Sequence, residues 1–277
     1  MRSPINLSAI SGLPIAMGQN LELVFPHSMM VRNVSERSLD EMRPFLQSAS
    51  VTATKNIIYR VWHQAAMMAD QAKIKATGLR YDLTAIEAGT FKLGNDENEF
   101  FKTAGHYHPD INGVNYPEVY EVLAGLGQWI IQRFSGSPEI VDQAYLIEAS
   151  PGEKILIPPG FGHVTINSCN ETLVIANVIG ASVGHEYTAF EKLHGACYRL
   201  LASTRFDMVE IERNTRYLQI PDLAKLKPKK DWLKGYFDPL YSLLAKTPES
   251  LTFLAEPESY NPEFFSMKKL YQEITVS

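Results

Sequence analysis

The sequence predicts an all-β domain, and two observations lead to this expectation. Between about residues 81 and 180, short runs rich in β-branched and aromatic residues alternate with glycine and proline. The turn signals recur at a spacing that is typical of an all-β sandwich or barrel. The expected strands lie near residues 82–88, 118–124, 127–134, 143–148, 153–158, 163–167 and 172–179.

The segment before these strands has mixed signals. Residues 1–30 are expected to form an irregular N-terminal arm, and the β domain is expected to span residues 31–217. Ser38 and Glu41 have the spacing of a capping box, which predicts a helix start. The stretch 57–66 fits a helix and a buried strand equally well.

The composition after Asp222 changes to that of helices. Runs such as residues 232–245 and 262–271 carry this signal. We therefore expect residues 218–277 to form a helical C-terminal extension of the β domain and not a separate domain.

Composition and charge exclude several classes of protein. The chain has 277 residues with 45% hydrophobic and 21% charged residues, which is ordinary for a globular protein. Its net charge of −5 and pI near 5.8 give no basic excess for binding nucleic acid or an anionic membrane surface. Any anionic ligand must then be held by local groups.

The cysteines and the N-terminus bear on the compartment. Cys169 and Cys197 are the two cysteines, and no CxxC spacing occurs, which argues against a disulfide framework and a zinc knuckle. Residues 1–20 lack the pattern of a signal peptide, and residues 173–183 are too short to span a bilayer. A cytoplasmic location is the simplest expectation.

Four residues form the candidate metal site: His106, His108, Glu118 and His163. The i, i+2 spacing of the first two places both imidazoles on one face of a strand. Three imidazoles and one carboxylate can bind a first-row divalent metal and leave coordination positions open. A lone histidine is more often structural or exposed, so the surrounding motifs decide the interpretation.

Two motifs surround these residues. From Gly152 the chain reads Gly-x5-Pro-x-Gly-x2-His-x3-Asn and ends at Asn167, and from Glu118 it reads Glu-x6-Gly and ends at Gly125. Both resemble the motifs of the cupin family, which implies a double-stranded β-helix, or jelly-roll barrel. The segment 109–117 between His108 and Glu118 is longer than in most cupins.

One branch of that family is more similar. The run 99–108, which ends in Thr-Ala-Gly-His-Tyr-His, the Glu-Val-Tyr at 118–120 and the Gly-His-Glu-Tyr at 184–187 resemble segments of the cupin-type glucose-6-phosphate isomerases, known mainly from archaea. The resemblance covers roughly residues 30–215 and is absent from residue 218 onward. Ile179 stands where that family has a tyrosine, and the same strand offers Asn177.

The resemblance implies an activity, interconversion of glucose 6-phosphate and fructose 6-phosphate, and a site. It implies one divalent metal per subunit, with Fe²⁺ the expected ion and Mn²⁺, Ni²⁺ or Zn²⁺ as alternatives. We also expect a homodimer. The implied residues are metal ligands His106, His108, Glu118 and His163; phosphate-binding residues Thr84, Thr103, Gly105 and Tyr120; and catalytic residues Glu118, His185 and Tyr187.

Several alternatives stay open at this point. Proton transfer through an enediol, with Glu118 as base, and a metal-assisted hydride shift both fit the residues. An iron dioxygenase and a non-enzymatic sugar-phosphate sensor are rival functions on the same scaffold. The segment 109–117 is expected to form a loop over the metal, near the sugar end of the pocket.

Overall fold

Two large sheets form the body of the protein. The structure, a computed structural model, describes residues 4–48, 50–94, 97–203 and 209–274. The first sheet has the strand order β15-β12-β17-β9-β7-β5. Its strands are β5 (Asn33–Ser38), β7 (Ile57–His63), β9 (Leu79–Ile86), β12 (Glu118–Ala124), β15 (Lys154–Ile157) and β17 (Leu173–Gly180).

The second sheet runs in the order β19-β18-β11-β16-β13-β14-β20-β21, with β10 and β6 branching from β11. Its strands are β6 (Thr52–Ala53), β10 (Thr90–Gly94), β11 (Glu97–Lys102), β13 (Gly127–Ser135), β14 (Ser137–Ala149), β16 (Gly162–Asn167), β18 (Tyr198–Ala202), β19 (Val209–Arg213), β20 (Ala224–Pro228) and β21 (Tyr271–Glu273). All pairs are antiparallel except β14 with β20.

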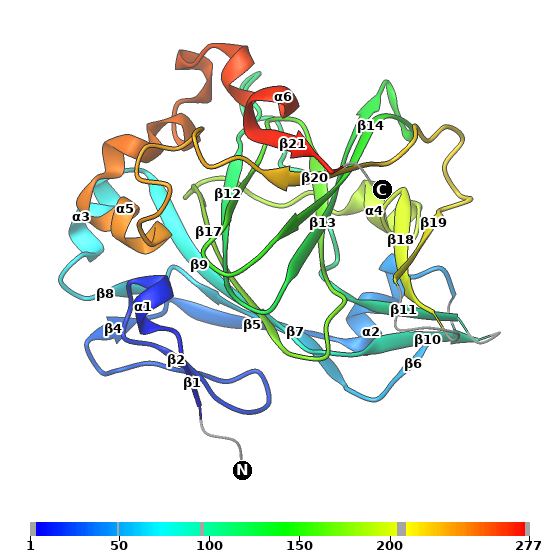
Figure 1. Ribbon diagram of the computed structural model, residues 1–277, viewed down its shortest axis with the longest axis horizontal. Coiled ribbons are helices and arrows are strands. Elements are labelled where there is room, and N and C mark those ends of the chain that lie inside the picture. The colour runs from blue at the N-terminus through cyan, green and yellow to red at the C-terminus, as the bar shows by residue number, and fades with distance from the viewer. Residues whose placement is uncertain (1–3, 49, 95–96, 204–208, 275–277) are drawn as a thin grey trace.

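The two sheets enclose a common core (Figure 1). Tyr120 on β12 packs against Trp129 on β13, with 5.8 Å between ring centroids, and so joins one sheet to the other. Every residue of β17 is buried, because the second sheet covers one of its faces and α5 packs near the other. This explains why the strand appears in the sequence as an unbroken apolar run.

Short elements surround the sheets. They are the strands β1 (Ile5–Asn6), β2 (Ala16–Met17), β3 (Leu23–Val24), β4 (Met29–Met30) and β8 (Ala66–Met67), the helices α1 (Ser8–Ser11), α2 (Leu39–Met42), α3 (Gln71–Ala76), α4 (Thr188–Lys192), α5 (Leu240–Lys246) and α6 (Met267–Leu270), and the 3-10 helices η1 (Arg43–Phe45), η2 (Pro248–Leu254), η3 (Pro257–Ser259) and η4 (Pro262–Phe265). No helix of the described residues is long and apolar enough to cross a membrane.

The expectation of an all-β jelly roll is confirmed. Each strand expected from the sequence is present, and β12 has the expected bounds. The capping box is confirmed as well, since the Ser38 hydroxyl accepts from the Glu41 backbone N–H and the Glu41 carboxylate accepts from that of Ser38. The ambiguous stretch 57–66 is mainly strand β7.

The flanking segments are more ordered than the sequence indicated. Strands β1, β2 and β3 form a small sheet within the N-terminal arm. The C-terminal extension has only short helices, and its strands β20 and β21 join the second sheet beside β14. The division into an arm at 1–30, a domain at 31–217 and an extension at 218–277 stays a prediction.

A buried ion pair connects the C-terminal extension to strand β12. The Glu121 Oε1 and Lys154 Nζ atoms lie 2.7 Å apart, and both side chains are 1% exposed. Glu121 Oε2 also accepts from the Leu240 backbone N–H, and the Lys154 ammonium donates to the Tyr236 carbonyl. The Glu121 carboxylate and the Lys154 ammonium both have hydrogen-bond partners on the C-terminal extension, so the extension covers the outer face of this sheet and satisfies the buried pair.

Candidate active site

The four expected metal ligands meet inside the barrel. Glu118 is the first residue of β12, in the first sheet, and His163 lies in β16, in the second. An isolated bridge holds His106 against His163, and His108 follows two residues later. One ligand atom from each of these residues lies within 4.8 Å of the others, so the structure brings the four expected ligands together.

The donor set fits a divalent metal ion. The Nδ1 of His108 lies 2.7 Å from the Tyr116 carbonyl oxygen, which can only accept, so this nitrogen carries the proton. Its Nε2 therefore offers a lone pair, and this atom is buried without a hydrogen-bond partner among the described residues. The same holds for Nε2 of His106. Imidazole and carboxylate donors suit Fe²⁺, Mn²⁺, Ni²⁺ and Zn²⁺.

The protonation states also fit metal binding. Burial, with the nearby imidazoles of His163 and His185, holds the pKa of His106 well below its usual value, so this ring is neutral. Burial alone would raise the pKa of Glu118, but the imidazoles of His108 and His163, 3.3 and 3.4 Å from its Oε2, outweigh it and hold that pKa well below its usual range. Neutral imidazoles and an ionised carboxylate are the forms that bind metal.

Both carboxylate oxygens of Glu118 are already engaged. The Tyr120 hydroxyl donates to Oε2 over 2.9 Å, and the Asn177 amide donates to Oε1 over 2.7 Å. The Tyr120 hydroxyl also lies 2.9 Å from Nε2 of His163. The structure thus places Tyr120, which the resemblance assigned to the phosphate, among the metal ligands. Ile179 is fully buried and does not line the cavity, whereas Asn177 does.

A cavity of about 340 Å³ opens onto this cluster. It is lined by all of the residues expected to bind phosphate or to act in catalysis, namely Thr84, Thr103, Gly105, Tyr120, Glu118, His185 and Tyr187, and by His106. His108 and His163 are buried behind that lining. The structure therefore brings the whole predicted site together.

One wall of the cavity offers donors suited to an anion. The Thr103 hydroxyl accepts from the Thr165 backbone N–H, so its own proton is free to donate. The Gly105 N–H makes no hydrogen bond to any described residue. Gly105 has φ +79°, and a Cβ there would lie 2.4 Å from Val164, so only glycine fits.

Arg37 is the single Lys or Arg side chain among the described residues that line this cavity, and sequence reasoning missed it. Its guanidinium carbon lies 5.4 Å from the Tyr187 ring centroid, and it interacts with Tyr59 and Tyr187. The Tyr59 hydroxyl accepts from the Ala104 N–H, next to Gly105. Burial raises the pKa of Tyr59 to about 12, so Tyr59 stays a neutral donor. Tyr59 thus connects the Arg37 cation to the residue before Gly105, and both Arg37 and Gly105 line the cavity.

His185 and Tyr187 form a pair at the same cavity. The Tyr187 hydroxyl and the His185 Nδ1 lie 3.2 Å apart, and the His185 ring packs on His106 with 4.1 Å between centroids. Burial lowers the pKa of His185 to about 4, so the ring is neutral near pH 7 and able to accept a proton.

Other lining residues were not assigned to the site from the sequence. They are Ser35, Glu36, Glu41, Tyr59, Val61, His63, Asp82, Ala104, Thr165 and Ile175. Most of these residues lie on β5, β7 and β9 and belong to no sequence motif. They could have been assigned to the site only if the pairing of these three strands had been known.

The segment 109–117 forms a loop, as expected. None of its residues lines the cavity, so the expectation that it covers the sugar end stays a prediction. The loop lies behind His108, where the Tyr116 carbonyl fixes the ring.

Comparison with known proteins decides the family. The family model described as glucose-6-phosphate isomerase (GPI) matches residues 38–217, well over half of the chain. The chain belongs to the GPI family. Within this family, it is 32% identical to the glucose-6-phosphate isomerase of Thermococcus litoralis over 131 residues, 47% of this chain and 58% of that protein. It is 30% identical to the Pyrococcus abyssi enzyme over 131 residues, 47% of this chain and 59% of that protein.

This GPI family member therefore spans less than two thirds of the length of these relatives. Among solved structures, procruciferin from Brassica napus aligns with a TM-score of 0.32 at 13% identity, over 57% of this chain and 33% of that one. Oxalate decarboxylase from Bacillus subtilis aligns with a TM-score of 0.30 at 16% identity, over 47% of this chain and 27% of that one.

Proposed function

We propose that this chain interconverts glucose 6-phosphate and fructose 6-phosphate with a bound divalent metal. The observation that supports this most is the arrangement of the cavity. A His₃Glu cluster lies beside it, and Gly105, directly before His106 in the chain, lines the same space and has an N–H without a partner among the described residues. A phosphate and the reacting carbons of one short sugar chain can therefore be held together.

The anion is proposed to bind between Arg37, Thr84, Thr103 and Gly105. Arg37 supplies the positive charge that the chain as a whole lacks, and the hydroxyls and the amide supply directional donors. Tyr120 is instead proposed to orient Glu118, because its hydroxyl already donates to that carboxylate.

The metal, when bound, would stabilise negative charge that develops on the substrate oxygens. His185 is the better candidate for carrying a proton to or from the sugar, since both oxygens of Glu118 accept hydrogen bonds. Tyr187 would hold the His185 ring through Nδ1. Glu118 would then bind the metal, with its carboxylate oriented by the Tyr120 hydroxyl and the Asn177 amide.

Two variants distinguish these roles. His185→Gln should keep its metal and lose about two to four orders of magnitude in turnover, the usual worth of an acid–base group. Glu118→Gln should bind metal more weakly and recover part of its turnover when metal is in excess. The opposite pattern, with full metal and negligible turnover in Glu118→Gln alone, would return the role of base to Glu118.

The activity itself is tested by a coupled assay of fructose 6-phosphate conversion. Metal-stripped protein should be inactive and should regain activity with Fe²⁺, the ion proposed here, or with Mn²⁺, Ni²⁺ or Zn²⁺. Oxygen uptake without isomerisation would indicate a dioxygenase, and tight sugar-phosphate binding without turnover would indicate a sensor. The expected homodimer stays a prediction that light scattering can test.

The phosphate site is tested by Arg37→Ala. We expect KM for fructose 6-phosphate to rise about ten- to hundredfold with metal content unchanged, as for loss of a charge-assisted hydrogen bond. Arg216→Ala, at an exposed position outside the cavity, removes the same charge and should change little. Equal calorimetric affinity for glucose and glucose 6-phosphate would rule out the phosphate site.

A further inference from the structure

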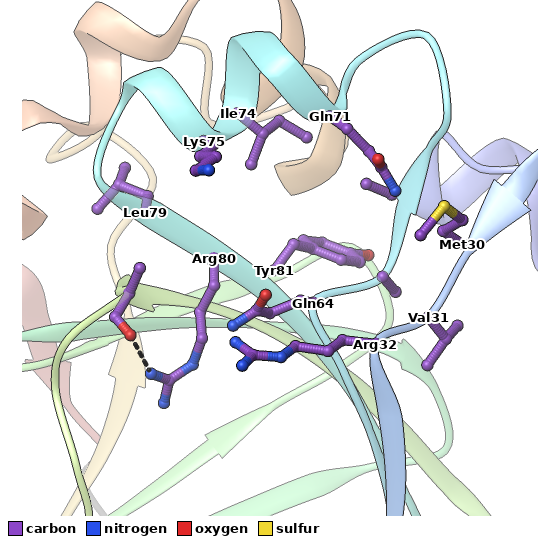
Figure 2. Close-up of a pocket in the computed structure, with 13 residues that line it drawn as sticks. Met30, Val31, Arg32, Gln64, Gln71, Ile74, Lys75, Leu79, Arg80 and Tyr81 are labelled. Carbon is purple, nitrogen blue, oxygen red and sulfur yellow. Dashed lines mark hydrogen bonds between the residues drawn. The ribbon is translucent and has the colours of Figure 1, made fainter.

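A second and larger cavity, of about 600 Å³, lies outside the proposed catalytic site. Its walls come from α3, the start of β9, the segment Met30–Arg32 and the turn between β7 and β8. Figure 2 shows that the side chains of Arg32, Gln64 and Arg80 gather on one side of it, while Ile74 and Leu79 lie on the other. Nothing in the proposed reaction uses these residues.

The charge of this cavity differs from that of the chain. Three cations, Arg32, Lys75 and Arg80, line it, and no carboxylate does so among the described residues. Arg80 is held by Asp82 and by three carbonyl groups. Arg32 and Lys75 form no ion pair with any carboxylate in the described part of the chain. Arg32 and Lys75, both at exposed positions, are therefore the cations of this cavity that an anion could pair with directly, whereas Arg80 already has Asp82 as its partner.

The rest of the lining is mainly apolar, with one exception. Ile74, Leu79 and Tyr81 are buried and form a hydrophobic wall. The Tyr81 hydroxyl is buried and has no hydrogen-bond partner among the described residues. The hydroxyl is thus enclosed by the protein, and Tyr81 contributes its ring to the apolar wall.

We propose that this cavity binds a small organic anion, with a carboxylate or phosphate head against Arg32 and Arg80 and a compact apolar body against Ile74, Leu79 and Tyr81. The guanidinium fork matches both kinds of head group. The cavity volume suits a ligand of this size, and an apolar wall with a few convergent polar groups is typical of ligand sites.

The anion site is connected to the catalytic cavity through Asp82. The Arg80 Nε donates to Asp82 Oδ2 over 2.9 Å, and the Gln64 backbone N–H donates to Oδ1 over 2.7 Å. Arg80 and Gln64 line the anion site, whereas Asp82 and His63 line the catalytic cavity. An anion that competes for Arg80 would therefore weaken the contacts that hold Asp82, two residues before Thr84 on β9. Occupancy of one cavity is thus coupled to substrate binding in the other, a claim that rests on the proposed function.

Binding is tested directly by calorimetry with three probes of similar shape. Phenyl phosphate and benzoate carry the two head groups, and benzamide is the neutral control. At least one anion should bind in about one equivalent, and benzamide should not bind. Whichever anion binds more tightly identifies the head group, and binding of neither anion, or equal binding of benzamide, would overturn the proposal.

Two variants locate the bound probe. Arg32→Ala should weaken binding about tenfold or more, as for loss of a charged hydrogen-bond donor. Lys73→Ala removes one charge from the same helix, α3, but lies outside the cavity and should leave affinity unchanged. A loss of binding in Arg37→Ala with none in Arg32→Ala would place the probe in the catalytic cavity and refute the site.

The coupling is measured separately as KM for fructose 6-phosphate at saturating probe. We expect a change of about fivefold, the low end of usual allosteric couplings, and its loss in Arg32→Ala. An unchanged KM with an intact binding isotherm would overturn the coupling alone. A chain without isomerase activity would refute the proposed function and leave the calorimetric result standing.

Discussion

Gly105 offers a sharp test of how closely the barrel packs around the metal ligands. In Gly105→Ala the new Cβ would lie 2.4 Å from Val164 Cγ2, 3.1 Å from Phe190 Cδ1 and 3.3 Å from the His163 carbonyl oxygen. A residue with a Cβ at φ +79° costs about 1–2 kcal/mol. Overpacking of a tight core costs about 1–3 kcal/mol more. The free energy of unfolding should thus fall by about 2–5 kcal/mol.

Gly136→Ala is the matched control, because Gly136 has φ +76° but nothing within 4 Å of the built Cβ. When both variants are unfolded in urea, the free energy of unfolding of Gly136→Ala should fall only by the cost of a Cβ at positive φ, about 1–2 kcal/mol. Gly105→Ala should also displace His106 and so bind less metal, as measured by elemental analysis. If the two variants were equally stable and Gly105→Ala kept its full metal content, the close approach at this glycine would be refuted.

Two further predictions concern the metal and the pH dependence. His163→Ala should lose most of its metal, because three protein ligands bind far more weakly than four, and full occupancy in that variant would contradict the ligand assignment. Asp82→Ala should lower the free energy of unfolding by about 3–5 kcal/mol at pH 7, because it leaves the Arg80 charge without its partner. Burial would raise the pKa of Asp82, but His63 and Arg80 outweigh it and lower that pKa. The contribution of Asp82 to the free energy of unfolding is therefore fully present above pH 3.8, the ordinary aspartate pKa, and is lost as the pH falls through its lower folded-state pKa. The free energies of unfolding of Asp82→Ala and the parent, measured in urea, should therefore become equal in acid.

The sequence was most informative where local signals are strong. Glycine and proline mark the ends of the strands, and the spacing of His106 and His108 fixes their common face. The match of β12 to its expected bounds reflects the strand-like residues 118–124 and the Pro117 and Gly125 that flank them. Such features depend on neighbours in the chain, which is why they can be inferred without a structure.

Features that depend on distant pairing were missed. Arg37 reaches the cavity only because β5 pairs with β7, and no motif marks it. Strand β20 was assigned to a helical extension, since its partner β14 lies far upstream in the chain. Tyr120 was assigned to the phosphate by resemblance, whereas its contacts to Glu118 and His163 become visible only when the two sheets close.

Strand β12 has a further consequence for how the protein opens and closes in solution. Its backbone pairs with β15 on one edge and β17 on the other, and its two faces carry Glu118 toward the barrel and Glu121 toward the C-terminal extension. Amides with such protection exchange with solvent only through the largest opening motions. Hydrogen exchange along β12 should therefore report global unfolding. If the C-terminal extension is removed, the β12 amides should exchange faster, because smaller opening motions would then expose them to solvent.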